Sequence, residues 1–195
     1  MRVIAGIYKS RPLSSLRGQQ TRPTSDRLRE TLFNILTAGS PEVLEGTVWL
    51  DLYAGTGAVG IEAISRGAAR VYFVDSAPPA ARLVRQNLES LRVPSGYEVI
   101  QDDIARALWV LRRRHVSPDI VFLDPPYQAV EEYARTLRAL EDAELIWAMS
   151  LVIAEHDKHF DPGDEYGQLR RFRKAVQGDS ALSFYRLGAA TPPQL

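Results

Sequence analysis

The stretch Val48-Trp49-Leu50-Asp51-Leu52-Tyr53-Ala54-Gly55-Thr56-Gly57-Ala58-Val59-Gly60 joins a compact apolar run to a glycine-rich loop. Its first six residues predict a buried strand, and residues 57–65 predict a helix. The glycines permit a tight turn and let a ligand approach the backbone closely. The spacing also fits the dinucleotide-binding fingerprint, with Asp75 at about the expected distance, although this pattern alone does not identify the ligand.

The same alternation continues along the chain. Further strands are predicted at residues 71–74, 98–101, 120–123 and 151–155, and helices at 79–91, 104–113 and 131–140. Residues 169–176 and 181–187, joined by the turn 177–180, predict an antiparallel hairpin. We therefore expect a Rossmann-like α/β fold whose mostly parallel seven-stranded sheet, covered on both faces, ends in a C-terminal antiparallel hairpin.

The N-terminal part predicts a small extension of this fold. Residues 3–8 are typical of a short strand, and a helix beginning at Thr24 or Ser25 is expected to run to Leu36, before Gly39-Ser40-Pro41. We accordingly divide the chain into a basic arm and helix, residues 1–40, and a main domain, residues 41–195.

Composition excludes several classes of protein. The 195 residues contain no cysteine, which excludes disulfides, thiolate metal sites and thiol nucleophiles, and no apolar run reaches the length of a membrane span. The first residues are too short and too soon charged for a secretory signal. We expect a soluble, cytoplasmic, monomeric protein without a metal site.

Charge is distributed unevenly although 24 basic residues balance 24 acidic ones. Residues 1–30 carry seven basic and two acidic side chains, and residues 169–195 carry five basic and one acidic, so the middle of the chain is acidic. If the two ends meet in space, they form a surface suited to phosphates. The predicted RNA contacts are Arg2, Lys9, Arg11, Arg17, Arg22, Thr24 and Arg27, with Arg29 added on charge alone. The alternative is a solvated basic face.

Acidic residues lie at or just after the ends of the first three predicted strands, where ligands of α/β sheets bind. Asp51 is unsuited to a pyrophosphate but suited to a ligand ammonium group, as in S-adenosylmethionine; the alternative is a cap for neighbouring backbone amides. Asp75 is placed to accept ribose hydroxyls, or else to cap the next helix. Asp102 or Asp103 is placed to accept an adenine amino group, and Asp103 is favoured because Ile104 resumes the apolar pattern.

The fourth loop, Asp124-Pro125-Pro126-Tyr127, follows a buried strand. Two prolines remove backbone donors and leave carbonyls free to accept, which suits an amino group attached to a planar ring. Acceptance of that NH2 by the Asp124 carboxylate and the Pro125 carbonyl draws its lone pair out of conjugation, and Tyr127 is placed to stack on the ring. The alternative is a proline-stiffened turn with a packing tyrosine.

These motifs resemble those of amino methyltransferases that use S-adenosylmethionine. The stretch from Arg22 to Asn34, the opening Met1–Gly6, the segment Gly60–Ala68 and the closing Gly178–Arg186 resemble the RsmD family in particular, over nearly the whole chain. The resemblance implies methylation of the exocyclic N2 of guanine 966 in 16S ribosomal RNA, within the assembled or assembling 30S subunit. Tyr127 stands where many relatives have Phe, and Asp103 where some have Asn.

The resulting active-site prediction places Asp124, Pro125, Pro126 and Tyr127 at the reacting amine. The predicted cofactor contacts are Asp51, Tyr53, Ala54, Gly55, Thr56, Gly57, Asp75, Ser76, Asp102, Asp103, Ile104 and Asp124. Because the proton can leave after methyl transfer, this hypothesis needs no base tuned to neutral pH, and the three histidines are expected to be structural.

Three alternatives remain open at this point. The same loops suit an amino methyltransferase acting on DNA adenine N6, on another RNA guanine N2 or on a protein glutamine. A nicotinamide-dependent oxidoreductase fits the glycine loop but not Asp51 or the Asp124–Tyr127 motif. A non-catalytic RNA-binding module is disfavoured by the intact acidic residues.

Overall fold

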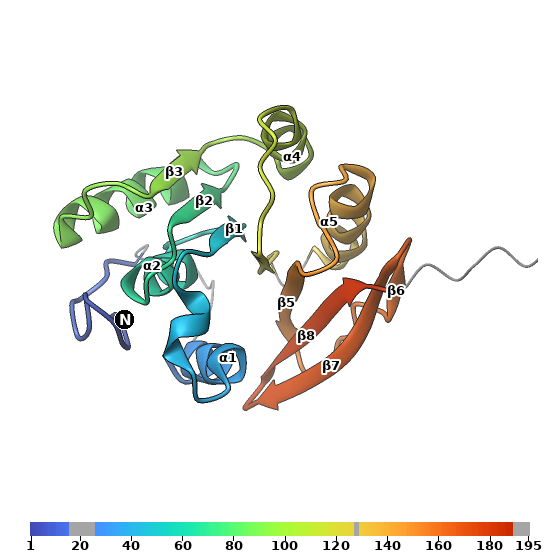
Figure 1. Ribbon diagram of the computed structural model, residues 1–195, viewed down its shortest axis with the longest axis horizontal. Coiled ribbons are helices and arrows are strands. Elements are labelled where there is room, and N and C mark those ends of the chain that lie inside the picture. Colours follow the sequence, from blue (N-terminus) through green and yellow to red (C-terminus); the bar gives the residue numbers. More distant parts are fainter. Residues whose placement is uncertain (16–25, 127–128, 189–195) are drawn as a thin grey trace, which may run out of the picture.

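The computed structural model describes residues 1–15, 26–126 and 129–188 of the chain. These residues form one eight-stranded sheet in the order β3-β2-β1-β4-β5-β8-β7-β6 (Figure 1). The strands are β1 (Val48–Leu52), β2 (Arg70–Val74), β3 (Tyr97–Ile100), β4 (Ile120–Leu123), β5 (Leu151–Asp157), β6 (Glu165–Tyr166), β7 (Leu169–Gln177) and β8 (Ser180–Leu187). The sheet has one strand more than predicted because the two-residue β6, too short for a periodic signal, pairs with β7.

Helices cover both faces of the sheet. They are α1 (Asp26–Thr37), α2 (Ala58–Ser65), α3 (Pro78–Leu91), α4 (Ile104–Arg113) and α5 (Val130–Asp142), with a short 3-10 helix η1 (Pro41–Leu44). The apolar residues of α1, α2 and α3 share one core cluster, and those of α4 and α5 share a second. The predicted helices are therefore confirmed to within two residues at each described end, whereas the capping residues Thr24 and Ser25 lie outside the described part.

The order in which strands are added to the sheet reverses at β1. Strand β1 pairs in parallel with β2 on one side and with β4 on the other. Leu52 at the end of β1 is level with Val74 and with Leu123. This arrangement is the topological switch point at which open α/β sheets bind ligands beyond the carboxyl ends of their strands. The predicted hairpin is also confirmed, because β8 runs antiparallel to both β5 and β7.

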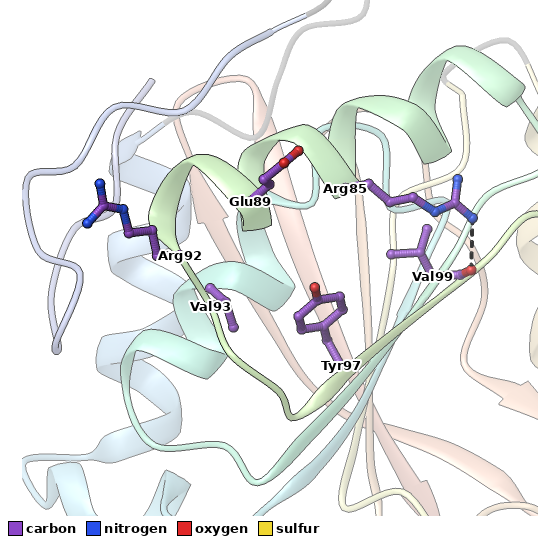
Figure 2. A pocket seen from close by; sticks show the side chains of 6 residues that line it. All are labelled: Arg85, Glu89, Arg92, Val93, Tyr97 and Val99. Carbon is purple, nitrogen blue, oxygen red and sulfur yellow. Dashed lines mark hydrogen bonds between the residues drawn. The ribbon is translucent and has the colours of Figure 1, made fainter.

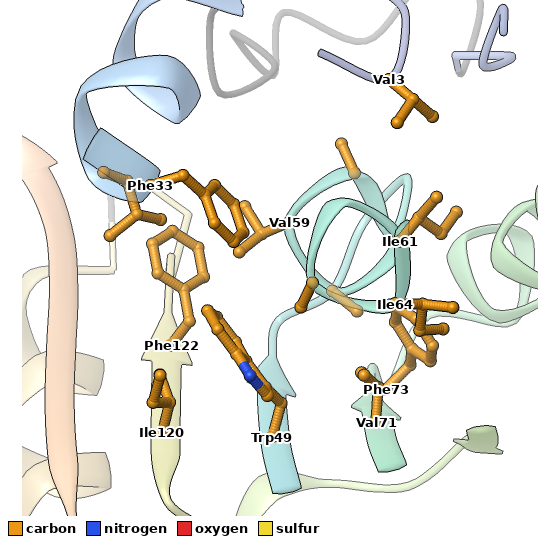
Figure 3. Packing of buried hydrophobic residues seen from close by; sticks show 14 of the residues in the cluster. Val3, Phe33, Trp49, Val59, Ile61, Ile64, Val71, Phe73, Ile120 and Phe122 are labelled. Carbon is orange, nitrogen blue, oxygen red and sulfur yellow. The ribbon is translucent and has the colours of Figure 1, made fainter. Parts of the chain in front are cut away.

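Large side chains fill the first cluster, which is drawn in Figure 3. The ring of Phe33, from α1, stacks on Trp49 of β1 with centroids 5.5 Å apart, and the Arg66 guanidinium lies 4.7 Å from the Phe33 centroid. Helix α2 packs closely on the sheet because Gly60 has no side chain: a Cβ there would lie 2.3 Å from Phe73 Cε1. The glycine loop is thus held at a set height above the strand ends.

The strand predicted for residues 3–8 is wrong. This segment forms turns, with one isolated bridge between Arg2 and Pro12. Its backbone amides instead find an acceptor in the buried Glu62 of α2, because the Glu62 carboxylate accepts from Ile4 at 2.7 Å and from Ala5 at 2.9 Å. The apolar sequence suggested a strand, but Val3 alone is buried while Ile7 is 78% exposed.

No helix in the described ranges is long and apolar enough to cross a membrane. This finding concerns residues 1–15, 26–126 and 129–188 alone.

The N-terminal segment docks on α2 through Gly6. Gly6 has a φ of +78°, and a Cβ there would lie 1.8 Å from the Ser65 carbonyl oxygen. That oxygen accepts from the Ile7 amide at 2.8 Å. We expect Gly6→Ala to destabilise the folded protein in two ways. Alanine disfavours the left-handed backbone conformation at this position. Its Cβ would also push this segment off α2, which lowers the free energy of unfolding by a further amount of about 1–3 kcal/mol. Urea unfolding and hydrogen exchange at Ile7 measure both effects.

Gly46→Ala is the matched control. Gly46 has a similar φ of +75°, but no atom lies within 4 Å of the position that a Cβ would take there. Gly46→Ala should therefore lower the free energy of unfolding by about 1 kcal/mol, which is the cost of the left-handed conformation alone. Equal losses of unfolding free energy in the two variants would show that the contact with Ser65 is not limiting.

Candidate active site

Three carboxylates meet at the ends of the adjacent strands β1, β4 and β5. Asp51 belongs to β1, Asp124 follows β4 directly, and Glu155 belongs to β5. Leu123 is level with Ala154, so Asp124 and Glu155 are next to each other. Side chains alternate along strands, and Trp49, Phe122 and Ile153 belong to the α1–α3 cluster. All three acids therefore lie on that same face of the sheet.

Asp51 is 2% exposed and accepts a hydrogen bond from the Gly60 amide, with 2.9 Å between the atoms. Burial raises the pKa of Asp51 to about 8; the bond from Gly60 opposes this shift and the nearby Asp75 charge adds to it. One oxygen thus acts as the amide cap considered from the sequence. A buried acid of this kind gains most from a cationic ligand, since a positive charge beside it stabilises the carboxylate.

Asp124 has a strongly perturbed carboxyl group. Burial, together with the charges of Glu155 and Asp51, raises its pKa well above the ordinary value. Its amide donates to the Leu52 carbonyl at 3.4 Å, so the start of the loop is tied to β1. Pro125 is buried and Pro126 is exposed, whereas Tyr127 lies outside the described residues. The sequence did not indicate this shift, because the desolvation depends on which residues pack around Asp124. That methyl transfer needs no base tuned to neutral pH stays a prediction.

Asp75 fastens the glycine loop to the second strand. Its carboxylate accepts from the Gly55 amide at 2.9 Å and from the Ala77 amide at 2.8 Å. The cap position of α3 is occupied by Ala77, so Asp75 is not the helix cap itself. Ser76, next to it, is exposed. Asp75 lies at the rim of the loop, where its remaining acceptor capacity is available to a ligand.

Asp102 and Asp103 are both engaged at the start of α4. Asp103 caps the helix by accepting from the Arg106 amide at 3.0 Å. Asp102 accepts from the Asp103 amide at 3.0 Å, and its other oxygen lies 3.2 Å from Arg106 Nε. Ile104, the first residue of α4, is buried. The choice of Asp103 as the acceptor for adenine stays a prediction.

Tyr53 connects the glycine loop to α5. Its φ is +59°, and its hydroxyl lies 2.6 Å from the Thr136 hydroxyl and donates to Glu132 at 2.9 Å. Burial raises the pKa of Tyr53 to about 12. Ala54 and Gly57 close the turn itself, since the Gly57 amide donates to the Ala54 carbonyl at 2.7 Å.

Sequence reasoning missed Asn87, a buried residue of α3. Its Nδ2 donates to the Thr56 carbonyl at 2.9 Å, and its Oδ1 accepts from the Ser14 amide at 2.8 Å. It therefore joins the glycine loop to the basic arm. The signal was present, because Asn87 is a polar residue within the apolar stripe of the helix. Glu155 was missed too, although it ends an apolar strand just as the other site acids do.

The predicted RNA contacts fall into three groups. Arg2, Lys9, Arg11 and Arg27 are exposed, and Arg11 donates to the Ser90 carbonyl at 3.2 Å. Arg17, Arg22 and Thr24 lie outside the described residues. Arg29 is fully buried and bonded to Asp26 at 2.9 Å, so it is not a surface contact; on an amphipathic helix, charge alone does not reveal which face a residue occupies.

His156 follows Glu155 on β5, so its side chain lies on the opposite face of the sheet from the three acids. His156 is buried and lies 2.9 Å from the Ser183 hydroxyl, and burial lowers its pKa. In the described ranges, no group of three or more His, Asp or Glu side chains is arranged to hold a metal ion.

A groove of about 540 Å³ lies between α3 and the edge strand β3 (Figure 2). It is lined by Arg85, Glu89, Arg92, Val93, Tyr97 and Val99. None of these is a predicted site residue, and the groove lies beside the strands rather than beyond their carboxyl ends. We therefore place the candidate active site at the carboxylates and not in this groove.

Comparison with known proteins agrees with this architecture. The model of a family described as "Conserved hypothetical protein 95" matches residues 1–186. Ribosomal RNA small subunit methyltransferase D of Escherichia coli K12 is 32% identical over 188 residues, covering 95% of this chain and 89% of that protein. The chain belongs to the RsmD family. A Bacillus subtilis protein named as an rRNA methyltransferase, YlbH, is 33% identical over 95% of this chain and 98% of its own length.

Solved structures show the same fold. The methyltransferase yhhF of Escherichia coli has a TM-score of 0.78 and 28% identity, with 97% of this chain and 98% of that chain covered. SMU.776, a structure solved with SAH, has a TM-score of 0.63, 19% identity and coverage of 81% of this chain and 49% of that chain. The methyltransferase fold predicted from the RsmD motifs is thus confirmed.

The raised pKa of Asp51 predicts a pH dependence of stability. Because the folded protein holds this proton up to about pH 8 while the unfolded chain releases it near 3.8, stability contributed by Asp51 falls as pH rises between these values. Asp51→Asn keeps an acceptor for the Gly60 amide and removes the titration. We expect the slope of unfolding free energy against pH to be less negative in the variant, by up to about 1.4 kcal/mol per pH unit.

Urea unfolding of both proteins between pH 5 and pH 8, without ligand, measures this difference. Parallel curves would show that Asp51 is ionised in the folded protein despite its burial.

Proposed function

We propose that this protein transfers a methyl group from S-adenosylmethionine to the exocyclic N2 of a guanine in 16S ribosomal RNA, corresponding to guanine 966. The observation that carries the proposal is the desolvated Asp124, beside Glu155 and followed by two prolines, at the switch point of the sheet. Family membership and relatives named as small-subunit rRNA methyltransferases support the substrate class. A ribosomal substrate also implies action in the cytoplasm.

The residues present fit this cofactor. Its cationic amino acid part is matched by Asp51, whose burial makes a positive partner favourable. Its ribose is matched by Asp75, and its adenine by Asp102 or Asp103 at the end of β3. The backbone of Ala54–Gly57 permits the close approach that the nucleoside needs. The cofactor supplies an activated methyl group on a sulfonium, so the chain mainly has to supply position.

Asp124 and the Pro125 carbonyl act on the target amine. Acceptance of both N2 hydrogens localises the nitrogen lone pair and directs it at the methyl group. Positive charge that develops on nitrogen is then met by fixed acceptors in a desolvated corner. Since burial raises the pKa of Asp124, its carboxylate is also a better proton acceptor than an exposed aspartate once the methylated nitrogen releases its proton.

Other amino groups on planar rings, including adenine N6 of DNA, would also suit the site formed by Asp124 and the Pro125 carbonyl. Two features favour RNA: the exposed basic residues Arg2, Lys9 and Arg11 on the N-terminal arm, and the link from this arm through Asn87 to the glycine loop. A target guanine must leave its stack to reach the corner, which is easiest in a loop or a weakly paired helix. We therefore retain RNA guanine as the substrate.

Asp124→Asn tests the catalytic assignment. The amide is nearly isosteric but carries no negative charge and presents donors to the amine. We expect kcat to fall about 10²–10⁴-fold. Calorimetry with S-adenosylmethionine measures separately the loss of cofactor affinity, because Asp124 is also a predicted cofactor contact. A variant that retains wild-type turnover would remove Asp124 from the mechanism.

The substrate is tested with ribosomal particles. Small subunits from a strain without the gene, incubated with the protein and labelled S-adenosylmethionine, should yield N2-methylguanosine at a single position by mass spectrometry of nuclease digests. Duplex DNA is the parallel substrate. If methylated adenine formed in the DNA and no label entered the RNA, the result would instead support a DNA adenine methyltransferase.

A further inference from the structure

The outer hairpin β7–β8 separates its basic residues into two groups by face. On the α4–α5 side, Arg171 is bonded to Asp161 at 2.6 Å and forms an ion pair with Asp164, and Lys174 lies 3.9 Å from Asp161. The Asp161 pKa is accordingly lowered to about 2, mainly by the hydrogen bond from Arg171. Charge on this face is neutralised within the protein.

The opposite face holds an aromatic side chain among arginines. Phe172 is 53% exposed, and its ring lies 6.4 Å from that of Phe184. The Arg186 guanidinium lies over Phe172 at 4.9 Å and that of Arg173 over Phe184 at 5.8 Å. Within the described ranges, neither Arg173 nor Arg186 has a carboxylate within 4.0 Å. Arg170, also exposed, has one acidic partner, Glu165, at 3.4 Å. We call Arg170, Phe172, Arg173 and Arg186 the hairpin patch.

A β-bulge creates this patch. The pairing of β7 with β8 shifts register between Arg171 and Arg173. The extra residue lets Phe172 and Arg173 both reach the side of Phe184, where a regular strand would turn one of them away. An arginine on an edge strand can serve simply to prevent aggregation. That role does not explain the exposed Phe172 ring between guanidinium groups, because an exposed ring increases the apolar surface.

The register of the sheet relates the patch to the active site. Asp51 is level with Phe122, Phe122 with Ile153, Ile153 with Phe184, and Phe184 with Arg173. All belong to the face that carries the three carboxylates. Four strand spacings separate Asp51 from Arg173, a distance of about 19 Å. This is the span of a few nucleotides.

Helix α1 lies beside the end of β7 (Figure 1). The Thr31 hydroxyl donates to Gln177 of β7 at 3.2 Å. Arg27, four residues earlier in α1, occupies the same side of the helix and is exposed. Helix α1, which carries the exposed Arg27, therefore contacts the end of the basic hairpin, although the chain is neutral overall.

We propose that the hairpin patch binds the ribosomal RNA strand that flanks the target guanine, with Arg173 and Arg186 on phosphates and a base stacked on Phe172. This inference rests on the proposed function. Charge selects the occupant, because unpaired guanidinium groups suit the phosphate backbone and the exposed ring suits an unstacked base. The patch contributes to the affinity for RNA and does not touch the reacting atoms.

The test compares Arg173→Ala/Arg186→Ala and Phe172→Ala with a matched control. The control is Trp109→Ala/Arg113→Ala on α4, where Arg113 lies 4.8 Å over a Trp109 ring that is 56% exposed. Binding to protein-free 16S RNA and to small subunits is measured against salt concentration, together with kcat and KM for methylation.

We expect the arginine variant to raise KM about tenfold with kcat unchanged, and to weaken binding to both substrates. The slope of log affinity against log salt concentration should become shallower by the amount that corresponds to the loss of one to two phosphate contacts. Phe172→Ala should weaken binding about tenfold without changing that slope. The control should match the wild type in every measurement.

Salt slopes and KM equal to those of wild type would overturn the proposal, as would losses no larger than those of the control. Weaker binding to small subunits with unchanged binding to free RNA would also overturn it, since the partner would then be a ribosomal protein. These outcomes are distinct from failure of the proposed function, in which the wild-type protein itself would not methylate guanine in small subunits.

Discussion

The gathering of three carboxylates at the switch point is the constraint on which the rest of this structure depends. Asp51, Asp124 and Glu155 lie on one face, at the ends of neighbouring strands, where Asp51 and Glu155 are buried and Asp124 is half-buried. Such a cluster is costly without cations or donors beside it. The fold meets part of this cost with the Gly60 amide, and the cationic cofactor and the target amine proposed here meet more of it. Electrostatic cost and catalytic use are thus two aspects of one arrangement.

The parts that surround the cluster serve mainly to position it. Asp75 fastens the glycine loop to β2, Tyr53 fastens it to α5, and Asn87 joins it to the arm. Glu62 holds the arm against α2 by accepting two backbone amides. A methyl transfer that depends on approach and orientation benefits from this rigidity, because the leaving group is already activated.

The RNA-binding surface proposed above depends on the same topology. The Thr31 hydroxyl of α1 bonds to Gln177 of β7, so two segments that are distant in sequence and that both carry exposed arginines lie side by side. The proposed catalytic residues belong to the acidic middle of the chain, and the proposed phosphate contacts belong to its basic ends. A neutral protein can thereby present a phosphate-binding face.

The sequence by itself determined the order of the helices α1–α5 and of every strand except β6, the four loops that carry acids, and the methyltransferase fold, because hydrophobic periodicity and glycine and proline positions are local signals. Tertiary structure decided the rest. Residues 3–8 are apolar, yet their amides pair with Glu62 rather than with a strand; Arg29 is basic, yet buried. Glu155 and Asn87 joined the site only through packing, and the raised pKa of Asp124 arises from desolvation by groups far apart in the chain. Such effects depend on which distant residues share a face, and a linear pattern does not contain that information.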